Sequence, residues 1–147
     1  MKKYKNKLFF CWLINVVIPI ALGAAIYILV RPDTYISHFA YRTLGVSWQG
    51  GIGRRMLPRW IWLFLTGHAS DILWAYGLTH AVFLILGKDR KCFLLTAAIC
   101  VVFEVGMECM QLLPGILATF DWWDIALEIC ATAIASLIIK LQWEEKK

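Results

Sequence analysis

Acidic side chains within apolar sequence are the residues of this chain best suited to chemistry, and they gather in residues 103–128, FEVGMECMQLLPGILATFDWWDIALE. Two apolar segments meet there at Pro114-Gly115. The polar residues of the first segment are spaced i, i+4 and i+7, and those of the second i, i+3 and i+7, so each set shares one helix face. These candidate ligand-binding or proton-binding residues are Glu104, Glu108, Gln111, Asp121, Asp124 and Glu128.

An ionised carboxylate at the centre of a bilayer costs about 2.5–3.5 kcal/mol, so these acids need a use or a partner. The predicted membrane spans contain no lysine or arginine except Lys140, near the inner end of the last span. Three solutions are open. The carboxylates are protonated, or they pair with Arg54, Arg55 or Arg59 from the first long connection, or they hold a metal ion or a ligand amine.

Structural roles are the alternative for several of these residues. Asp121 and Asp124 would favour the start of a helix through its dipole. His80 also belongs to the candidate site. It lies ~13 Å from Asp71 along the second predicted span, residues 70–86, and this places it in the outer half of the membrane. Both His80 and Gln111 would otherwise serve as ordinary interhelical hydrogen bonders.

Arg54 and Arg55 are candidate anion-contacting residues. They follow a glycine-rich stretch, residues 50–53, whose backbone N–H groups could hold a phosphate together with the two guanidiniums. The stretch lacks the P-loop lysine pattern and a flanking strand, so a flexible loop is the alternative.

Composition predicts an all-α membrane protein. The chain has 147 residues, of which 61% are hydrophobic, and a mean hydropathy of +0.66, so a bilayer must be the solvent for its apolar surplus. The formal charge of +5 is explained by the lysines and arginines that set the orientation of the chain in the membrane. No nucleic-acid partner is expected, because no basic face is interleaved with aromatic residues. Five cysteines without CxxC spacing predict neither a disulfide framework nor a zinc site.

The expected fold is a bundle of about four transmembrane helices in a single domain, residues 1–147, with spans at about 8–30, 70–86, 93–113 and 123–141. The first span is too long for a cleaved signal peptide, and Pro19 makes a tolerated kink in it. Leu57 to Leu65, in the first extracytoplasmic connection, is too short to span and suits the membrane interface. Small residues at Ala133 and Ser136 predict close helix packing on the last span.

Charge distribution predicts that both termini are cytoplasmic. Four spans place ten lysines and arginines on the side of the termini: Lys2, Lys3, Lys5, Lys7, Lys88, Arg90, Lys91, Lys140, Lys146 and Lys147. The other side holds five: Arg31, Arg42, Arg54, Arg55 and Arg59. By the positive-inside rule the acids then lie in the outer half of the membrane.

The acidic stretch resembles the VanZ-like family of small bacterial membrane proteins. Glu108-Cys109-Met110-Gln111 is similar to the E-x-x-Q of the family's penultimate helix, and Phe120-Asp121 with Asp124 is similar to its F-D-x-x-D. Glu128 stands where the family commonly has asparagine. The arginine that the family often has before the F-D motif is missing here, and Thr119 is the residue nearby. The resemblance implies a multi-pass cell-envelope protein, with teicoplanin resistance as the family's associated phenotype.

Three functions are compatible with these residues. The first is a non-enzymatic envelope protein that binds an envelope lipid, a cell-wall intermediate or a glycopeptide in an acidic outer-leaflet cavity and so alters antibiotic or envelope-stress sensitivity. The second is a metal-assisted enzyme acting on a lipid headgroup, which would hold a divalent cation; apart from this alternative, no cofactor is expected. The third is an accessory subunit whose acids pair with a membrane protein partner. No hydrolase or protease motif supports catalysis.

The topology prediction is testable with reporter fusions placed after Asn6 and after Lys147. Both fusions should report a cytoplasmic position, since the charge clusters nearest the span ends lie on that side. An extracytoplasmic signal at either end would contradict the predicted depth of the acids.

Overall fold

A computed structural model describes residues 10, 12–30, 35–45, 57–86, 90–113 and 120–144. Every element within these ranges is a helix, which confirms the all-α class. In chain order the helices are η1 (Leu13–Val17), α2 (Ile18–Val30), α3 (Tyr35–Leu44), α5 (Arg59–Gly67), α6 (Ala69–Leu86), α7 (Arg90–Met110) and α8 (Trp122–Glu144).

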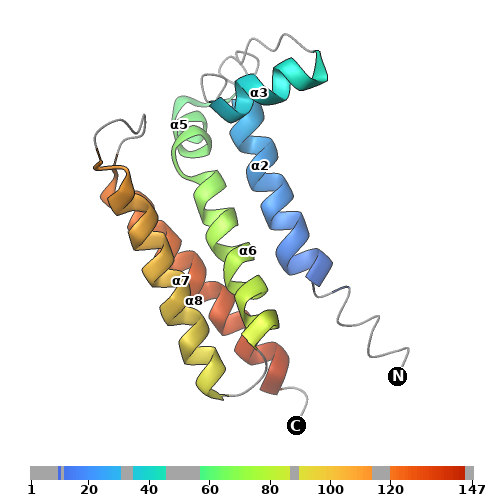
Figure 1. The fold of residues 1–147 in the computed structure, drawn as a ribbon, viewed down its shortest axis with the longest axis vertical. Helices are drawn as coiled ribbons and strands as arrows, with labels where there is room; N and C mark the ends of the chain where they lie inside the picture. Colours follow the sequence, from blue (N-terminus) through green and yellow to red (C-terminus); the bar gives the residue numbers. More distant parts are fainter. Residues whose placement is uncertain are drawn as a thin grey trace.

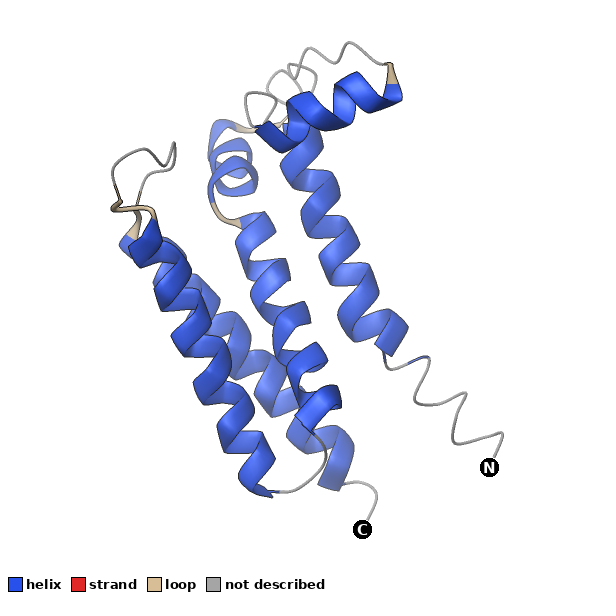
Figure 2. Ribbon diagram, viewed as in Figure 1, coloured by secondary structure: helices blue, strands red, loops and turns tan. Residues whose placement is uncertain are grey.

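Four long helical segments run side by side along the molecule, and two short helices lie at one end (Figures 1 and 2). Helix α6 is central, because it contacts η1, α2, α5, α7 and α8. The beginning of η1 and the end of α8 lie at the same end of the bundle (Figure 1). The other end, which we call the mouth end, holds α3, α5, the start of α6, the end of α7 and the start of α8.

The first long helix begins with a π-helical stretch that the sequence analysis did not predict. Pro19 has no backbone N–H and its ring clashes with the carbonyl group four residues earlier, that of Asn15. The chain accommodates this proline by widening the preceding turns into η1, and the N–H of Ile18 bonds the carbonyl oxygen of Leu13. The expected kink at Pro19 therefore takes the form of a local π-helix.

The bundle is apolar outside and partly polar inside. Large hydrophobic side chains face outward along the helices, including Ile85, which is 82% exposed, and Val102, which is 73% exposed. The largest fully buried side chains are those of Thr79, Thr96, Cys100 and Ser70. A water-soluble bundle would bury its largest hydrophobic residues and expose its polar ones, so this distribution suits hydrocarbon surroundings.

Two of the described helices are long and apolar enough to cross a membrane: α6, over Ala69–Leu86, and Cys92–Met110 of α7. These two helices match the second and third predicted spans to within a few residues. Leu13–Leu29 is apolar but shorter, and α8 covers the fourth predicted span with a length of 23 residues.

The segment predicted to lie at the membrane interface contains a helix. Helix α5 has 9 residues and carries the exposed Trp60 and Leu63. At 1.5 Å per residue it extends for roughly 13 Å, which is too short to span a bilayer. The neighbouring Arg54 and Arg55 lie outside the described residues.

Close helix packing is found on α8, although the prediction is wrong for Ala133. That residue is exposed, whereas Ser136 is buried. The buried face of α8 instead follows i, i+4 spacing in two adjacent rows, and it consists of Ala131, Ala135 and Ile139 beside Thr132 and Ser136. Ala133 is rotated by about 100° from Thr132 and so lies outside this face, whereas Ser136 lies one turn after Thr132 and within it.

Glycine allows α6 to approach the first helix closely. A Cβ atom at Gly77 would lie 2.8 Å from Cγ1 of Ile20 and 3.4 Å from the carbonyl oxygen of Val16. A Cβ atom at Gly23 would lie 2.6 Å from Cδ1 of Trp74. Both glycines therefore lie where the two helices are in contact, as small residues commonly do in membrane helices.

We predict that Gly77→Leu destabilises the folded protein by about 1–3 kcal/mol, because the added side chain overfills a packed contact. Gly106→Leu is the matched control, since a Cβ atom at Gly106 meets nothing within 4 Å. Thermal unfolding in detergent would measure both variants. Equal losses in the two variants would contradict close packing at Gly77.

Candidate functional site

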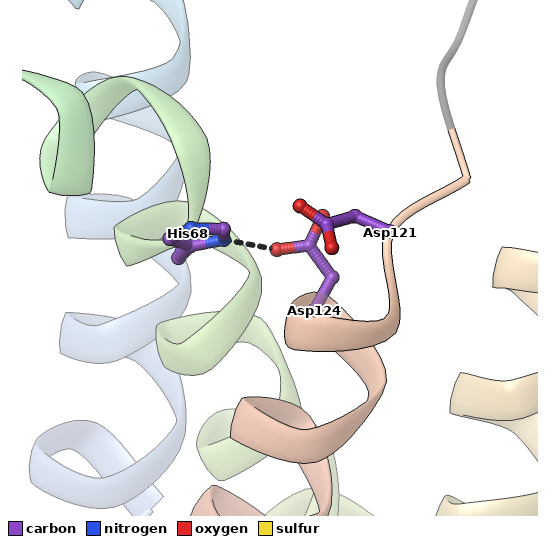
Figure 3. Close-up of side chains that lie close together, drawn as sticks. All are labelled: His68, Asp121 and Asp124. Atoms are coloured by element: carbon purple, nitrogen blue, oxygen red, sulfur yellow. Dashed lines mark hydrogen bonds and ion pairs between the residues drawn. The ribbon is translucent and has the colours of Figure 1, made fainter.

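The mouth end of the bundle brings a histidine and two aspartates together (Figure 3). His68 occupies the junction between α5 and α6, and its Nδ1 is paired with Oδ1 of Asp124 in the first turn of α8. Asp121, just before α8, points toward the same place. One ligand atom from each of the three residues lies within 4.8 Å of the others.

Asp121 and Asp124 also have the structural role that the sequence suggested. Oδ1 of Asp121 accepts a hydrogen bond of 2.9 Å from the backbone N–H of Trp123, and the Asp121 carbonyl oxygen accepts one of 3.2 Å from the N–H of Asp124. Asp121 is therefore the N-cap of α8. Both negative charges lie where the helix dipole favours them. The capping role and a ligand-binding role are compatible, because Oδ2 of Asp121 accepts no bond from the cap.

Glu108, near the end of α7, and Gln111, just after it, lie beside this group. Gln111 Nε2 donates a hydrogen bond of 2.5 Å to Glu108 Oε1, and the backbone N–H of Asp121 lies 3.5 Å from Glu108 Oε2. Glu108 is buried, while Gln111 is half-buried. These contacts connect the end of α7 to the start of α8 across the turn, so the E-x-x-Q and F-D-x-x-D segments meet in space.

Deeper in the bundle, Glu104 joins three helices through hydroxyl groups. Thr132 Oγ1 on α8 and Glu104 Oε1 on α7 share a hydrogen bond of 2.5 Å. Thr132 Oγ1 also lies 3.1 Å from Oγ1 of Thr79 on α6, and Thr79 donates a bond of 2.8 Å to the Ala75 carbonyl oxygen. The other carboxylate oxygen of Glu104, Oε2, is buried without a hydrogen-bond partner.

Glu128 lies between the deep and outer groups. Its Oε2 is also buried without a hydrogen-bond partner. Four other carboxylates are close enough to repel a negative charge on Glu128, namely those of Glu104, Asp71, Glu108 and Asp124. All of the predicted acids thus belong to one electrostatic cluster between α6, α7 and α8, which runs from the mouth toward the middle of the bundle.

His80 takes no part in this cluster. Its Nδ1 lies 3.1 Å from the carbonyl oxygen of Tyr76, and the two rings are 4.5 Å apart between centroids. Tyr76 itself donates a hydrogen bond of 2.8 Å to Asn15 in η1. His80 is buried, its Nε2 has no hydrogen-bond partner, and no hydrogen bond joins it to an acid among the described residues.

His68 and Asp71 are members of the cluster that sequence reasoning did not select. Both lie in or just before the first turn of α6, ahead of its apolar core. Their position was the useful signal, because the start of α6, with His68 and Asp71, lies at the same end of the bundle as Asp121 and Asp124. Thr132 and Thr79 carried no signal, since threonine is common in membrane helices.

The donor set at the mouth suits a cation. His68, Asp121 and Asp124 supply one imidazole nitrogen and carboxylate oxygens, which are ligands for Zn²⁺, Mn²⁺ or Mg²⁺ and acceptors for a ligand ammonium group. All three residues are half-buried, so a ligand can reach them from the end of the bundle. Arg54 and Arg55, the candidate anion contacts, lie outside the described residues.

Comparison of the chain with family models, curated proteins and solved structures finds no match, so the geometry of this cluster carries the functional argument.

Proposed function

We propose that the chain is a four-span protein of the bacterial cytoplasmic membrane that binds a cationic group at its acidic mouth. The ligand class is an amine-bearing envelope lipid, cell-wall intermediate or glycopeptide. Binding changes sensitivity to antibiotics or envelope stress without catalysis, as the resemblance to the VanZ-like family implies. In this proposal α2, α6, α7 and α8 are the spans, α5 lies at the interface, and both termini are cytoplasmic.

The observation that carries the proposal is the imbalance of charge at the mouth. Five carboxylates gather there and below it, those of Glu104, Glu108, Asp121, Asp124 and Glu128. Within the part of the chain that the structure describes, the only basic side chain in contact with any of these five is His68. A cationic ligand would neutralise charge that the described part of the chain leaves uncompensated.

The direction of the mouth follows from the lysines and arginines. Helix α7 begins at Arg90, and α8 ends shortly after Lys140, on the same side of the bundle. The mouth lies at the opposite end. The positive-inside rule assigns the lysine-rich side to the cytoplasm. The mouth then faces the outer leaflet, where envelope lipids and glycopeptides are present.

We predict that Glu108→Gln and Asp124→Asn each abolish the effect on envelope-stress survival while leaving the amount of folded protein in membranes unchanged. Each substitution keeps shape and hydrogen-bonding capacity but removes a charge. Because both acids serve one bound cation, the double variant should be no worse than either single variant. Survival under a glycopeptide or envelope challenge would be measured beside folded yield.

The matched control is Cys109→Ser, which changes the residue next to Glu108 at an exposed position and keeps every carboxylate of the cluster. It should retain activity. Full activity of the Glu108→Gln, Asp124→Asn double variant would contradict the proposed site.

A metal-assisted membrane enzyme is the second candidate, and the arrangement of His68, Asp121 and Asp124 favours it. Their ligand atoms lie within 4.8 Å of one another, close enough to share one divalent ion. Such an ion would act as a Lewis acid on a headgroup phosphate. The two candidates differ in whether the purified protein carries metal.

Metal analysis of protein purified without chelator separates these candidates. The amine-binding proposal predicts less than stoichiometric Zn²⁺, Mn²⁺ or Mg²⁺, with no dependence on His68. One equivalent of metal that is lost in His68→Ala and retained in His80→Ala would favour the enzyme instead.

A further inference from the structure

The hydroxyl chain below the mouth contains more hydrogen-bond contacts than hydrogens, unless Glu104 supplies one. Three oxygen–oxygen contacts follow one another: 2.5 Å from Glu104 Oε1 to Thr132 Oγ1, 3.1 Å from Thr132 to Thr79, and 2.8 Å from Thr79 to the Ala75 carbonyl oxygen. Each hydroxyl group has one hydrogen to donate. The two threonines therefore fill two contacts only.

An ionised Glu104 leaves one of these contacts without a hydrogen. If Thr132 donates to Glu104 and Thr79 donates to Ala75, two hydroxyl oxygens face each other at 3.1 Å with lone pairs alone. If Thr79 donates to Thr132 instead, its contact with the Ala75 carbonyl oxygen loses its hydrogen. A protonated Glu104 removes the conflict, because Glu104, Thr132 and Thr79 then each donate once, in one direction along the chain.

The surroundings of Glu104 agree with a neutral side chain. Glu104 is 3% exposed, and its Oε2 is buried without a hydrogen-bond partner. The titratable groups nearest to it are also acids or a thiol: Glu128 on α8 and Cys100 on its own helix, with Glu108 and Asp71 acting on Glu128 from α7 and α6. None of these groups can offer a positive charge, and an unpaired buried carboxylate is costly.

We propose that Glu104 is a proton-binding site, separate from the ligand site at the mouth, which holds its proton on Oε1 and donates it in a hydrogen bond to Thr132. The Thr132–Thr79 chain ends on the Ala75 carbonyl oxygen, so the bound proton is fully hydrogen-bonded across α7, α8 and α6. Glu128 and Glu108 extend the row of carboxylates from Glu104 toward the mouth.

This inference relies on the proposed membrane placement for its hydrocarbon surroundings, but it needs no ligand at the mouth. Infrared spectroscopy of the purified full-length protein at neutral pH tests it directly, because the C=O stretch of a carboxylic acid is resolved from carboxylate bands. The wild-type minus Glu104→Gln difference spectrum should contain a carboxylic acid band. Asp121→Asn is the control, and its difference spectrum should contain carboxylate bands alone.

A second variant tests the hydrogen bond. Thr132→Val retains the size of the side chain but removes the acceptor of the proton, so the Glu104 carboxylic acid band should move while its intensity remains. Size-exclusion chromatography would establish that each variant is folded. A wild-type minus Glu104→Gln spectrum with carboxylate bands only would overturn the proposal, as would a band unmoved in folded Thr132→Val. If the wild-type protein shows the carboxylic acid band but binds no ligand at the mouth, the proposed function is refuted and the proton-binding site is not.

Discussion

Burying carboxylates beside hydrocarbon is the constraint on which the rest of this structure depends. In the proposed membrane placement, each acid on α7 and α8 must be neutral, hydrogen-bonded or close to a cation, because hydrocarbon offers no water to solvate it. The structure meets the requirement with neighbours from three helices. Thr132 bonds Glu104, Gln111 bonds Glu108, and His68 pairs with Asp124.

That requirement also explains the position of α6. A helix packed against both α7 and α8 can bring hydroxyl and imidazole groups to acids on either of them. Thr79 reaches the deep acid through Thr132, and His68 reaches Asp124 at the mouth. On its other side α6 contacts the first helix closely at Gly77. One central helix thus supports the site and holds the bundle together.

Much of this arrangement could be predicted because helical spacing is a strong signal. The i, i+4, i+7 pattern placed Glu104, Glu108 and Gln111 on one face. In the structure Glu104 contacts α8, Glu108 contacts Asp121, and Gln111 bonds Glu108. Only nine residues separate Gln111 from Asp121 in the sequence, so the acids of the two segments could be expected to lie near one another. Helix class and the positions of α6 and α7 followed from apolar runs of sufficient length.

Other features depended on information that one sequence does not contain. His80 and Thr79 are adjacent, and rotation of about 100° per residue sends one to Tyr76 and the other to Thr132. Nothing in an apolar helix without a hydrophobic face fixes that rotation, so His80 was placed with the acids. The π-helix before Pro19 and the pairing of His68 with Asp124 likewise arise from contacts between distant residues.

A crystal structure of the protein extracted with its native lipids would test the central claim most directly, through the density beside Glu108 and Asp124. The account predicts ordered density that does not belong to the chain, bonded to the mouth carboxylates and His68. A guanidinium group of Arg54 or Arg55 occupying that place would contradict it, because the protein would then neutralise its own acids.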